Sequence, residues 1–270
     1  MNAPVTRHWI FLGMLVVVLV SMLINFRPDL QPSIETRRMF SFVDSLPTGS
    51  TILVSFDHEA SSLPEIRPLA IALLRHIFNR GDRVIGMALM AEGTVIGYRL
   101  LEQTAKEYGR QYGRDYVYLG FKPQNIAAIL SLGESFSKTF SSDYLGTPLE
   151  EIPMLGAIHD YKDVASVISI ADGNMPTYWI EYGGARFHVT VCSAMTAAMM
   201  TTFDPYVASG QLHSLVGGLR GAAEYETLIG IGGGGGRGML AQAAAHWYVL
   251  ALIIAGNVIY YLERRKARRS

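Results

Sequence analysis

Acidic and imidazole side chains stand at the ends of several apolar runs in this 270-residue sequence. Asp57, His58 and Glu59 close one run, Glu92 follows the next and Asp172 ends a later one. Carboxylate oxygens are the ligands that Mg²⁺ and Ca²⁺ prefer, and a histidine beside a carboxylate suits general-base catalysis. The candidate ligands of a divalent metal cofactor are therefore Asp57, Glu59, Glu92 and Asp172, and the candidate catalytic residues are His58, Glu59 and Asp172.

Further polar side chains at run ends are candidates for binding a small molecule. This candidate set consists of Asp57, Glu92, Lys122, Asn174 and Ser193. A competing interpretation needs no ligand, because Asp, Asn and Ser at such points often cap the next helix. Asn174 and Ser193 fit that interpretation well.

The motifs of common enzyme classes do not accompany these residues. Cys192 and Ser193 could be nucleophiles at a strand-to-helix turn, but the flanking residues Val191–Met195 lack the glycines of the Gly-x-Ser-x-Gly motif. Cys192, the single cysteine, fits a small buried hydrophobe better. The glycine pattern Gly230–Gly235 has phosphate-loop spacing but follows no predicted strand, so a flexible linker is favoured.

The apolar runs predict five buried strands that alternate with helices. Each run is continuous and β-branched rather than alternating, which is typical of a parallel sheet covered on both faces. The sequence therefore predicts an α/β fold: a three-layer, doubly wound, mostly parallel five-stranded sheet, Rossmann-like or flavodoxin-like. The predicted strands are 51–57, 83–90, 115–121, 164–172 and 186–193, and the predicted helices are 34–45, 62–79, 94–108, 124–132, 174–182, 193–202 and 204–226. In such a sheet the strand ends named above meet at one edge.

Half of the residues are hydrophobic, and the excess lies in two end segments. Trp9–Phe26 is uncharged and long enough to approach a membrane span. Met239–Leu262 contains a strongly apolar core, Trp247–Tyr261, with an aromatic pair at each end of that core. A cleaved signal peptide is the alternative for the first segment, and a buried helix is the alternative for the second. The sequence predicts one transmembrane helix at each end of a central domain.

Basic residues orient these two predicted spans. Residues 263–270 contain five basic side chains and Glu263, a net charge of +4, so the rest of the chain carries −4. Arg27, Arg37, Arg38 and Arg237 lie on the other side of the spans, and lysine and arginine concentrate on the cytoplasmic side of membrane proteins. We expect a two-pass cell-membrane protein with both termini cytoplasmic and the central domain extracytoplasmic.

These observations divide the chain into six expected regions. They are the cytoplasmic N-terminus with the first transmembrane helix (1–26), a linker (27–50), the α/β domain (51–228), a glycine-rich linker (229–238), the second transmembrane helix (239–262) and a basic cytoplasmic tail (263–270).

Three functions remain open at this point. The first is a ligand-binding or assembly module of a membrane complex, with the lipid bilayer and either other membrane proteins or further copies of the chain as partners. The second is a membrane-bound, metal-assisted hydrolase or transferase with an acidic site at the strand ends. The third, a small transporter component, rests only on the two spans. A nucleic-acid partner is not expected, because the body of the chain carries a net negative charge.

Overall fold

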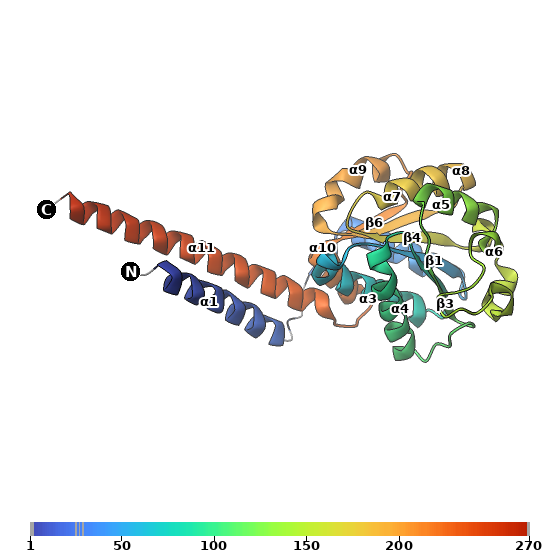
Figure 1. Ribbon diagram of the computed structural model, residues 1–270, viewed down its shortest axis with the longest axis horizontal. Coiled ribbons are helices and arrows are strands. Elements are labelled where there is room, and N and C mark those ends of the chain that lie inside the picture. Colours follow the sequence, from blue (N-terminus) through green and yellow to red (C-terminus); the bar gives the residue numbers. More distant parts are fainter. Residues whose placement is uncertain (1–2, 25, 27, 29, 269–270) are drawn as a thin grey trace. The chain divides into compact units, whose positions relative to one another are not determined.

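The computed structural model describes all residues except 1–2, 25, 27, 29 and 269–270 (Figure 1). Arg27, one of the basic residues used to orient the predicted spans, therefore lies outside the described residues. So do residues 269–270 at the end of the basic tail. Residue contacts separate two units: Asp29–Gly235, which holds the sheet, and a helical unit of Met1–Pro28 with Gly236–Ser270.

The sheet has six parallel strands in the order β3-β2-β1-β4-β5-β6. The order reverses between β1 and β4, so the sheet is doubly wound and Rossmann-like, as the sequence predicted in outline. The strands are β1 (Thr51–Asp57), β2 (Arg83–Ala88), β3 (Tyr116–Phe121), β4 (Ser166–Ala171), β5 (Val191–Met195) and β6 (Ser214–Gly217).

The sixth strand corrects the predicted five. Residues 204–226 were expected to form one helix, but α9 (Met200–Ala208) and α10 (Gly218–Leu228) flank β6 there. Gly210 and Gly218 both take positive φ angles, so a single helix cannot run through residues 204–226. The strand between these two glycines has only four residues, too few to show a hydrophobic period in the sequence. β5 also begins later than predicted and runs on to Met195, because His188 takes a left-handed conformation before it.

Alternate residues of each strand point to opposite faces of the sheet, and helices cover both faces (Figure 1). On one face Ile52, Val54 and Phe56 pack with buried side chains of α2 (Ile34–Ser45), α3 (Leu63–Asn79), α4 (Ala91–Glu107) and α10. On the other, Leu53 packs in a second core built from α5 (Asn125–Glu134), α6 (Phe136–Thr139), α7 (Met175–Tyr178), the π-helical turn η5 (Trp179–Gly184) and α9. The short helix α8 (Ala185–Phe187) follows η5.

Helix α2 belongs to this domain, and the expected linker at 27–50 is wrong for that part. Met39 and Val43 are fully buried in the core of the α3 face. Glu224 of α10 accepts hydrogen bonds from Ser33 and Thr36 at the start of α2. Burial by itself would raise the pKa of Glu224, but the hydrogen bonds, with that of Arg220, lower it. The two helices are therefore joined through a buried carboxylate.

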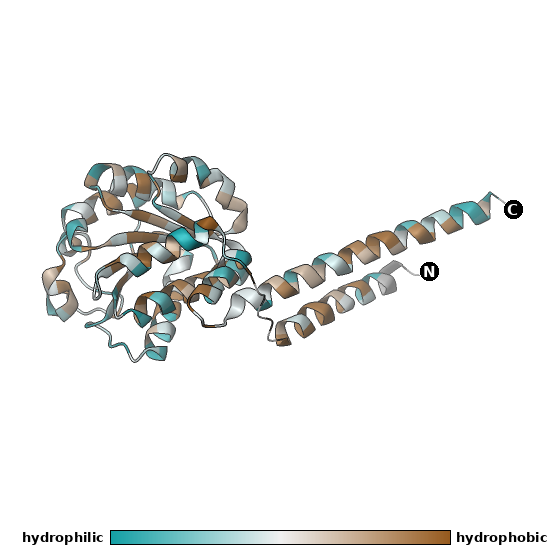
Figure 2. Ribbon diagram, turned by 180° about the vertical axis from the view of Figure 1, so that it is seen from behind, coloured by the Kyte–Doolittle hydropathy of each residue, from teal (hydrophilic) through white to brown (hydrophobic). Residues whose placement is uncertain are grey.

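The helical unit consists of α1 (Ala3–Leu23) and most of α11 (Gly234–Ala267), both rich in hydrophobic residues (Figure 2). In the described part of the chain only α11 is long and apolar enough to cross a membrane, whereas the apolar stretch Arg7–Leu23 falls below 18 residues. The structure thus provides one candidate span where the sequence predicted two. The Tyr248 hydroxyl of α11 donates to the Ile10 carbonyl of α1 at 3.1 Å.

The second half of the expected glycine linker is the first turn of α11. The Gly235 N–H donates to Glu226 at 2.9 Å, and a Cβ at Gly235 would lie 2.5 Å from the backbone nitrogen of Ala223. Glycine is therefore required there by a close approach to α10, so linker flexibility is not the explanation for this residue.

Candidate functional site at the switch point of the sheet

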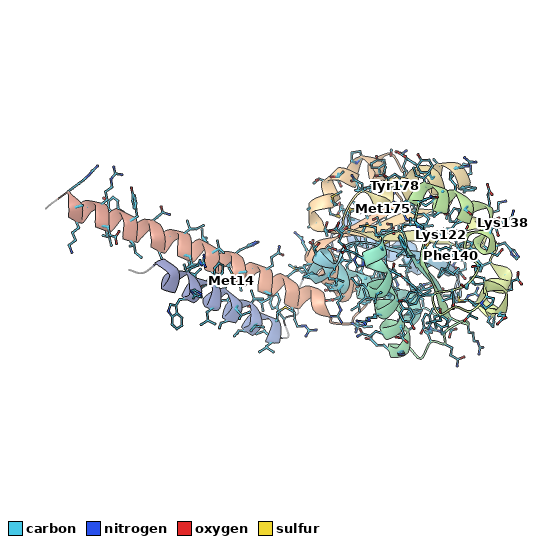
Figure 3. The ribbon with its side chains drawn as sticks, in the orientation of Figure 1. Met14, Lys122, Lys138, Phe140, Met175 and Tyr178 are labelled. Carbon is cyan, nitrogen blue, oxygen red and sulfur yellow. The ribbon has the colours of Figure 1, made fainter. Side chains whose placement is uncertain are left out.

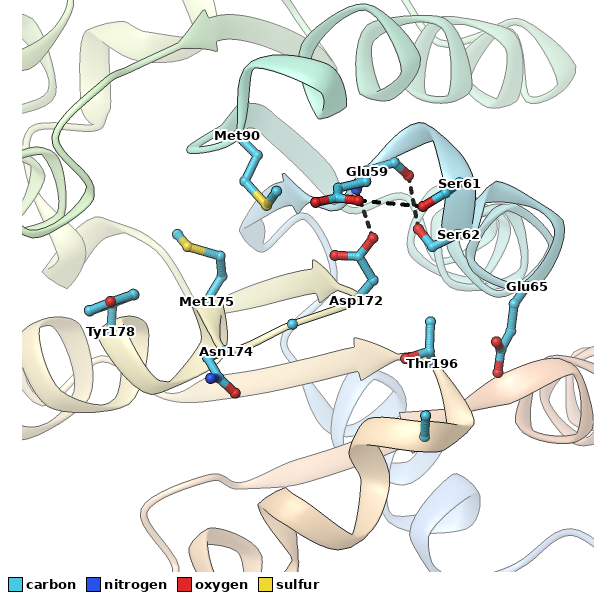
Figure 4. Close-up of a pocket in the computed structure, with 12 residues that line it drawn as sticks. Glu59, Ser61, Ser62, Glu65, Met90, Asp172, Asn174, Met175, Tyr178 and Thr196 are labelled. Atoms are coloured by element: carbon cyan, nitrogen blue, oxygen red, sulfur yellow. Dashed lines mark hydrogen bonds between the residues drawn. The ribbon is translucent and has the colours of Figure 1, made fainter.

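A cavity of about 560 Å³ opens at the carboxyl ends of β1 and β4, where the strand order reverses (Figure 4). In open α/β sheets this switch point is where ligands bind. The lining residues come from the segments after β1, β2, β4 and β5. They are Glu59, Ser61, Ser62, Glu65, Met90, Asp172, Gly173, Asn174, Met175, Tyr178, Thr196 and Ala198.

The loop after β1 is held in place by carboxylates from neighbouring strand ends. The Glu59 N–H donates to Asp172 at 2.8 Å, and the Ala60 N–H donates to Glu92 at 3.0 Å. The Ser62 hydroxyl donates to the Glu59 carbonyl at 2.9 Å. In dinucleotide-binding proteins the N–H groups of this loop face a pyrophosphate. Here two carboxylates already accept from them, so the loop is not a phosphate cradle.

Three carboxylates, those of Glu59, Glu65 and Asp172, give the cavity wall a negative charge. No described residue of the wall is basic, and none of the three carboxylates forms an ion pair with a described residue. Glu65 accepts from the Ala197 N–H at 2.6 Å, which connects α3 with the segment after β5. Glu65 was not among the predicted site residues. The sequence carries one local signal for it: Glu65 stands three residues after Ser62, which is the spacing of a capping box at the start of a helix.

The remaining wall is mixed in character. Met90, Met175 and Tyr178 lie together toward one end of it, away from Glu65 (Figure 4). Thr196, a residue only 9% exposed, lies across the cavity from them. Asn174 begins α7 without a side-chain capping hydrogen bond, so the cap interpretation is wrong for this residue. Its exposed side chain lines the cavity instead.

Asp57 does not line the cavity, although it was the first candidate ligand. Its side chain is fully buried, and it accepts four hydrogen bonds: from Ser55 and Leu89 on one oxygen, and from Ser169 and Trp179 on the other. Burial raises the pKa of Asp57, and the four hydrogen bonds oppose that shift. Asp57 therefore joins three strand ends to η5.

The candidate residues His58 and Glu92 lie beside the cavity rather than on its wall. His58 is fully buried, with Nδ1 3.1 Å from the Glu59 carbonyl oxygen, and its Nε2 has no partner among the described residues. Glu92 is exposed and holds the loop through Ala60.

Lys122, Ser193 and Cys192 have structural surroundings. Lys122 donates to the Thr139 carbonyl and lies 5.3 Å from the Phe140 ring centroid (Figure 3). Ser193 is buried within β5 and donates to the Ser169 carbonyl, so the expected helix cap is wrong. Cys192 is fully buried, which raises its pKa to about 12.

The four candidate metal ligands are not gathered around one point. In the part of the chain that the structure describes, no group of three or more His, Cys, Asp or Glu side chains is arranged to hold a metal ion. Of the four, Glu59 and Asp172 share the cavity wall, whereas Asp57 is enclosed by its own donors and Glu92 caps a loop.

Comparison with known protein families, with curated proteins and with solved structures found no match to this chain. The features of the molecule that bear on function are therefore its doubly wound, Rossmann-like sheet and the composition of the switch-point cavity.

Proposed function

We propose that this chain is a membrane-anchored ligand-binding module whose α/β domain binds a small molecule in the switch-point cavity. The observation that carries the proposal is that several strand ends contribute polar side chains to one cavity at the point of strand-order reversal. Its volume lies within the ~300–1,000 Å³ usual for small-molecule sites.

In this proposal α1 and α11 are both membrane anchors, with both termini cytoplasmic and the α/β domain extracytoplasmic. Large apolar side chains of both helices are exposed to their surroundings, among them Trp9, Phe11, Trp247, Ile254 and Ile259. Exposed apolar surface of that extent is stable in lipid and unfavourable in water. The five basic residues of 263–270 favour a cytoplasmic C-terminus. Other membrane proteins, or further copies of this chain, are the partners that such anchors would contact.

A ligand-binding role is preferred to the metal-assisted hydrolase or transferase. That enzyme would need its carboxylates converged within the 2.3–2.6 Å ligand distances of a shared ion. Asp57 instead accepts hydrogen bonds from protein donors on both of its oxygens.

Filling the cavity tests the proposal. A Cβ at Gly173 meets no atom within 4 Å, so the Gly173→Leu variant should fold and place its side chain in the cavity. Gly156 has equally open surroundings outside the cavity, and Gly156→Leu is the matched control. We expect at least one compound in a thermal-shift panel of amines, carboxylates, sugars and nucleotides to stabilise the detergent-solubilised full chain and the control, but not Gly173→Leu.

Two results would contradict the ligand-binding role. One is a panel in which no compound stabilises the wild-type chain. The other is a compound that stabilises Gly173→Leu as strongly as the wild type, since such a compound would bind outside the cavity.

A further inference from the structure

We infer that the ligand of the switch-point cavity is an organic cation with a protonated amine head and an apolar body. This inference rests on the proposed ligand-binding function and adds the chemical class of the ligand. Three independent features of the wall support it: uncompensated carboxylates, a hydroxyl without a partner, and an apolar end.

The carboxylates each use one oxygen within the protein and keep the other available. Asp172 accepts from the Glu59 N–H through Oδ2, Glu65 accepts from the Ala197 N–H through Oε1, and Glu59 has only a long contact of 3.5 Å with Ser61, through Oε2. The hydrogen bonds of these side chains within the described part of the chain leave Asp172 Oδ1, Glu65 Oε2 and Glu59 Oε1 unused. A cation in the cavity would meet three negative charges, whereas an anion would be repelled by all of them.

The Thr196 hydroxyl is the second feature. Thr196 as a residue is only 9% exposed, it lines the cavity, and its hydroxyl has no hydrogen-bond partner in the described part of the chain. Thr196 Oγ1 is not enclosed by protein, so the hydroxyl is available to a ligand in the cavity. An ammonium group has three N–H donors and could donate to Thr196 and to the neighbouring carboxylates together.

The apolar end of the cavity indicates the chemistry of the part of the ligand that carries no charge. Met90, Met175 and Tyr178 present two thioethers and an aromatic ring, and Met175 and Tyr178 lie one turn apart on α7 (Figure 3). Thioethers and aromatic rings favour apolar or aromatic groups. The wall therefore fits an arylalkyl amine, with the ammonium toward Asp172 and Glu65 and the ring toward Met175.

Three matched compounds test the charge requirement. Tyramine, 4-hydroxyphenylacetate and 4-ethylphenol share a phenol ring and differ in carrying an ammonium, a carboxylate or a neutral ethyl group. Titration calorimetry on the full chain in phosphatidylcholine nanodiscs should detect tyramine binding that weakens with added salt, and binding of the other two at least about tenfold weaker.

Side-chain variants then locate the site. Glu65→Gln and Asp172→Asn keep an acceptor for the backbone N–H but remove a charge, and each should weaken tyramine binding by about tenfold. Glu134→Gln removes an equally negative, exposed side chain outside the cavity and should leave affinity within about twofold. Thr196→Val should weaken binding several-fold while leaving the chain at least as heat-stable, an outcome that a purely structural hydroxyl would not produce.

Equal or tighter binding of 4-hydroxyphenylacetate or 4-ethylphenol, or no measurable tyramine binding, would overturn the inference. So would tyramine binding that Glu65→Gln and Asp172→Asn leave unchanged. The proposed function fails separately, when no compound of any class distinguishes the wild type from Gly173→Leu.

Discussion

The side chain of Asp57 lies where four hydrogen-bond donors from different parts of the chain meet. Ser55 and Leu89 donate to Oδ1 at 2.7 and 3.1 Å, and Ser169 and Trp179 donate to Oδ2 at 2.8 and 3.0 Å. Both oxygens must therefore accept, and two of the donors are N–H groups that cannot turn away. This single carboxylate connects β1, the end of β2 and β4 with η5, next to the strand ends that form the cavity.

Asp57→Asn should lower the free energy of unfolding by about 1–3 kcal/mol, because the amide nitrogen cannot accept. Whichever way the amide is turned, the N–H of either Leu89 or Trp179 loses its acceptor. Thermal unfolding in mild detergent would measure the loss. Asp172→Asn is the control, since only one oxygen of Asp172 accepts a hydrogen bond from the described chain. Equal stability of Asp57→Asn and wild type would contradict this account.

At the scale of the elements, two glycines allow α4 to lie directly on β1. A Cβ at Gly93 would lie 2.0 Å from the Phe56 carbonyl oxygen, and a Cβ at Gly97 would lie 2.5 Å from the Phe56 ring. Close approach of a helix to a strand places the start of α4 beside the loop after β1, where Glu92 accepts from Ala60. The loop that forms part of the cavity wall thus depends on residues with no side chain.

Gly93→Ala should destabilise the domain by about 1–3 kcal/mol, because the new methyl group collides with backbone that cannot yield. Alanine by itself favours a helix over glycine, so a loss of stability cannot be ascribed to helix propensity. The stability of Gly93→Ala can be measured by thermal unfolding, with Gly173→Ala as the control. A Cβ at Gly173 meets nothing within 4 Å, so the stability of that variant should remain close to that of the wild type. A gain of stability in Gly93→Ala would show that α4 is free to shift outward.

At the scale of the whole molecule, the chain combines a domain with two complete cores and a unit whose helices expose their apolar side chains. A water-soluble unit would bury such side chains, so a lipid environment is the arrangement we propose for α1 and α11. The switch-point cavity lies wholly within the domain unit, Asp29–Gly235.

Cysteine labelling tests the proposed topology without removing the native cysteine, because Cys192 is fully buried and its pKa is raised to about 12. A membrane-impermeant maleimide applied to intact cells should label Ser141→Cys in the domain. It should label Ser270→Cys in the tail only after permeabilisation. Labelling of Ser270→Cys in intact cells, with Ser141→Cys protected, would reverse the orientation; labelling of both would exclude a cytoplasmic tail.

Much of the fold follows from local sequence patterns. Continuous β-branched runs locate β1 to β4 to within a few residues, and the run 34–45 coincides with α2, because burial of a strand or helix leaves its period in the residues themselves. The short β6 lacks that signal. Its place at the sheet edge depends on pairing with β5, a contact between separate segments that no local pattern in the sequence predicts. The docking of α2 on the sheet is decided in the same way, by the side chains that Met39 and Val43 meet.

For the site, the strand pattern was enough to predict that polar residues meet at one edge, since parallel strands end together. Glu59, Asp172 and Asn174 of that prediction line the cavity. Which polar groups face the cavity depends on packing between segments far apart in the sequence. Asp57 lies two residues after Ser55 on the same face of β1, and η5 covers both with Trp179, so its charge is enclosed. Glu65 and Thr196 reach the cavity because α3 and β5 converge there, a contact between distant segments that no local spacing records.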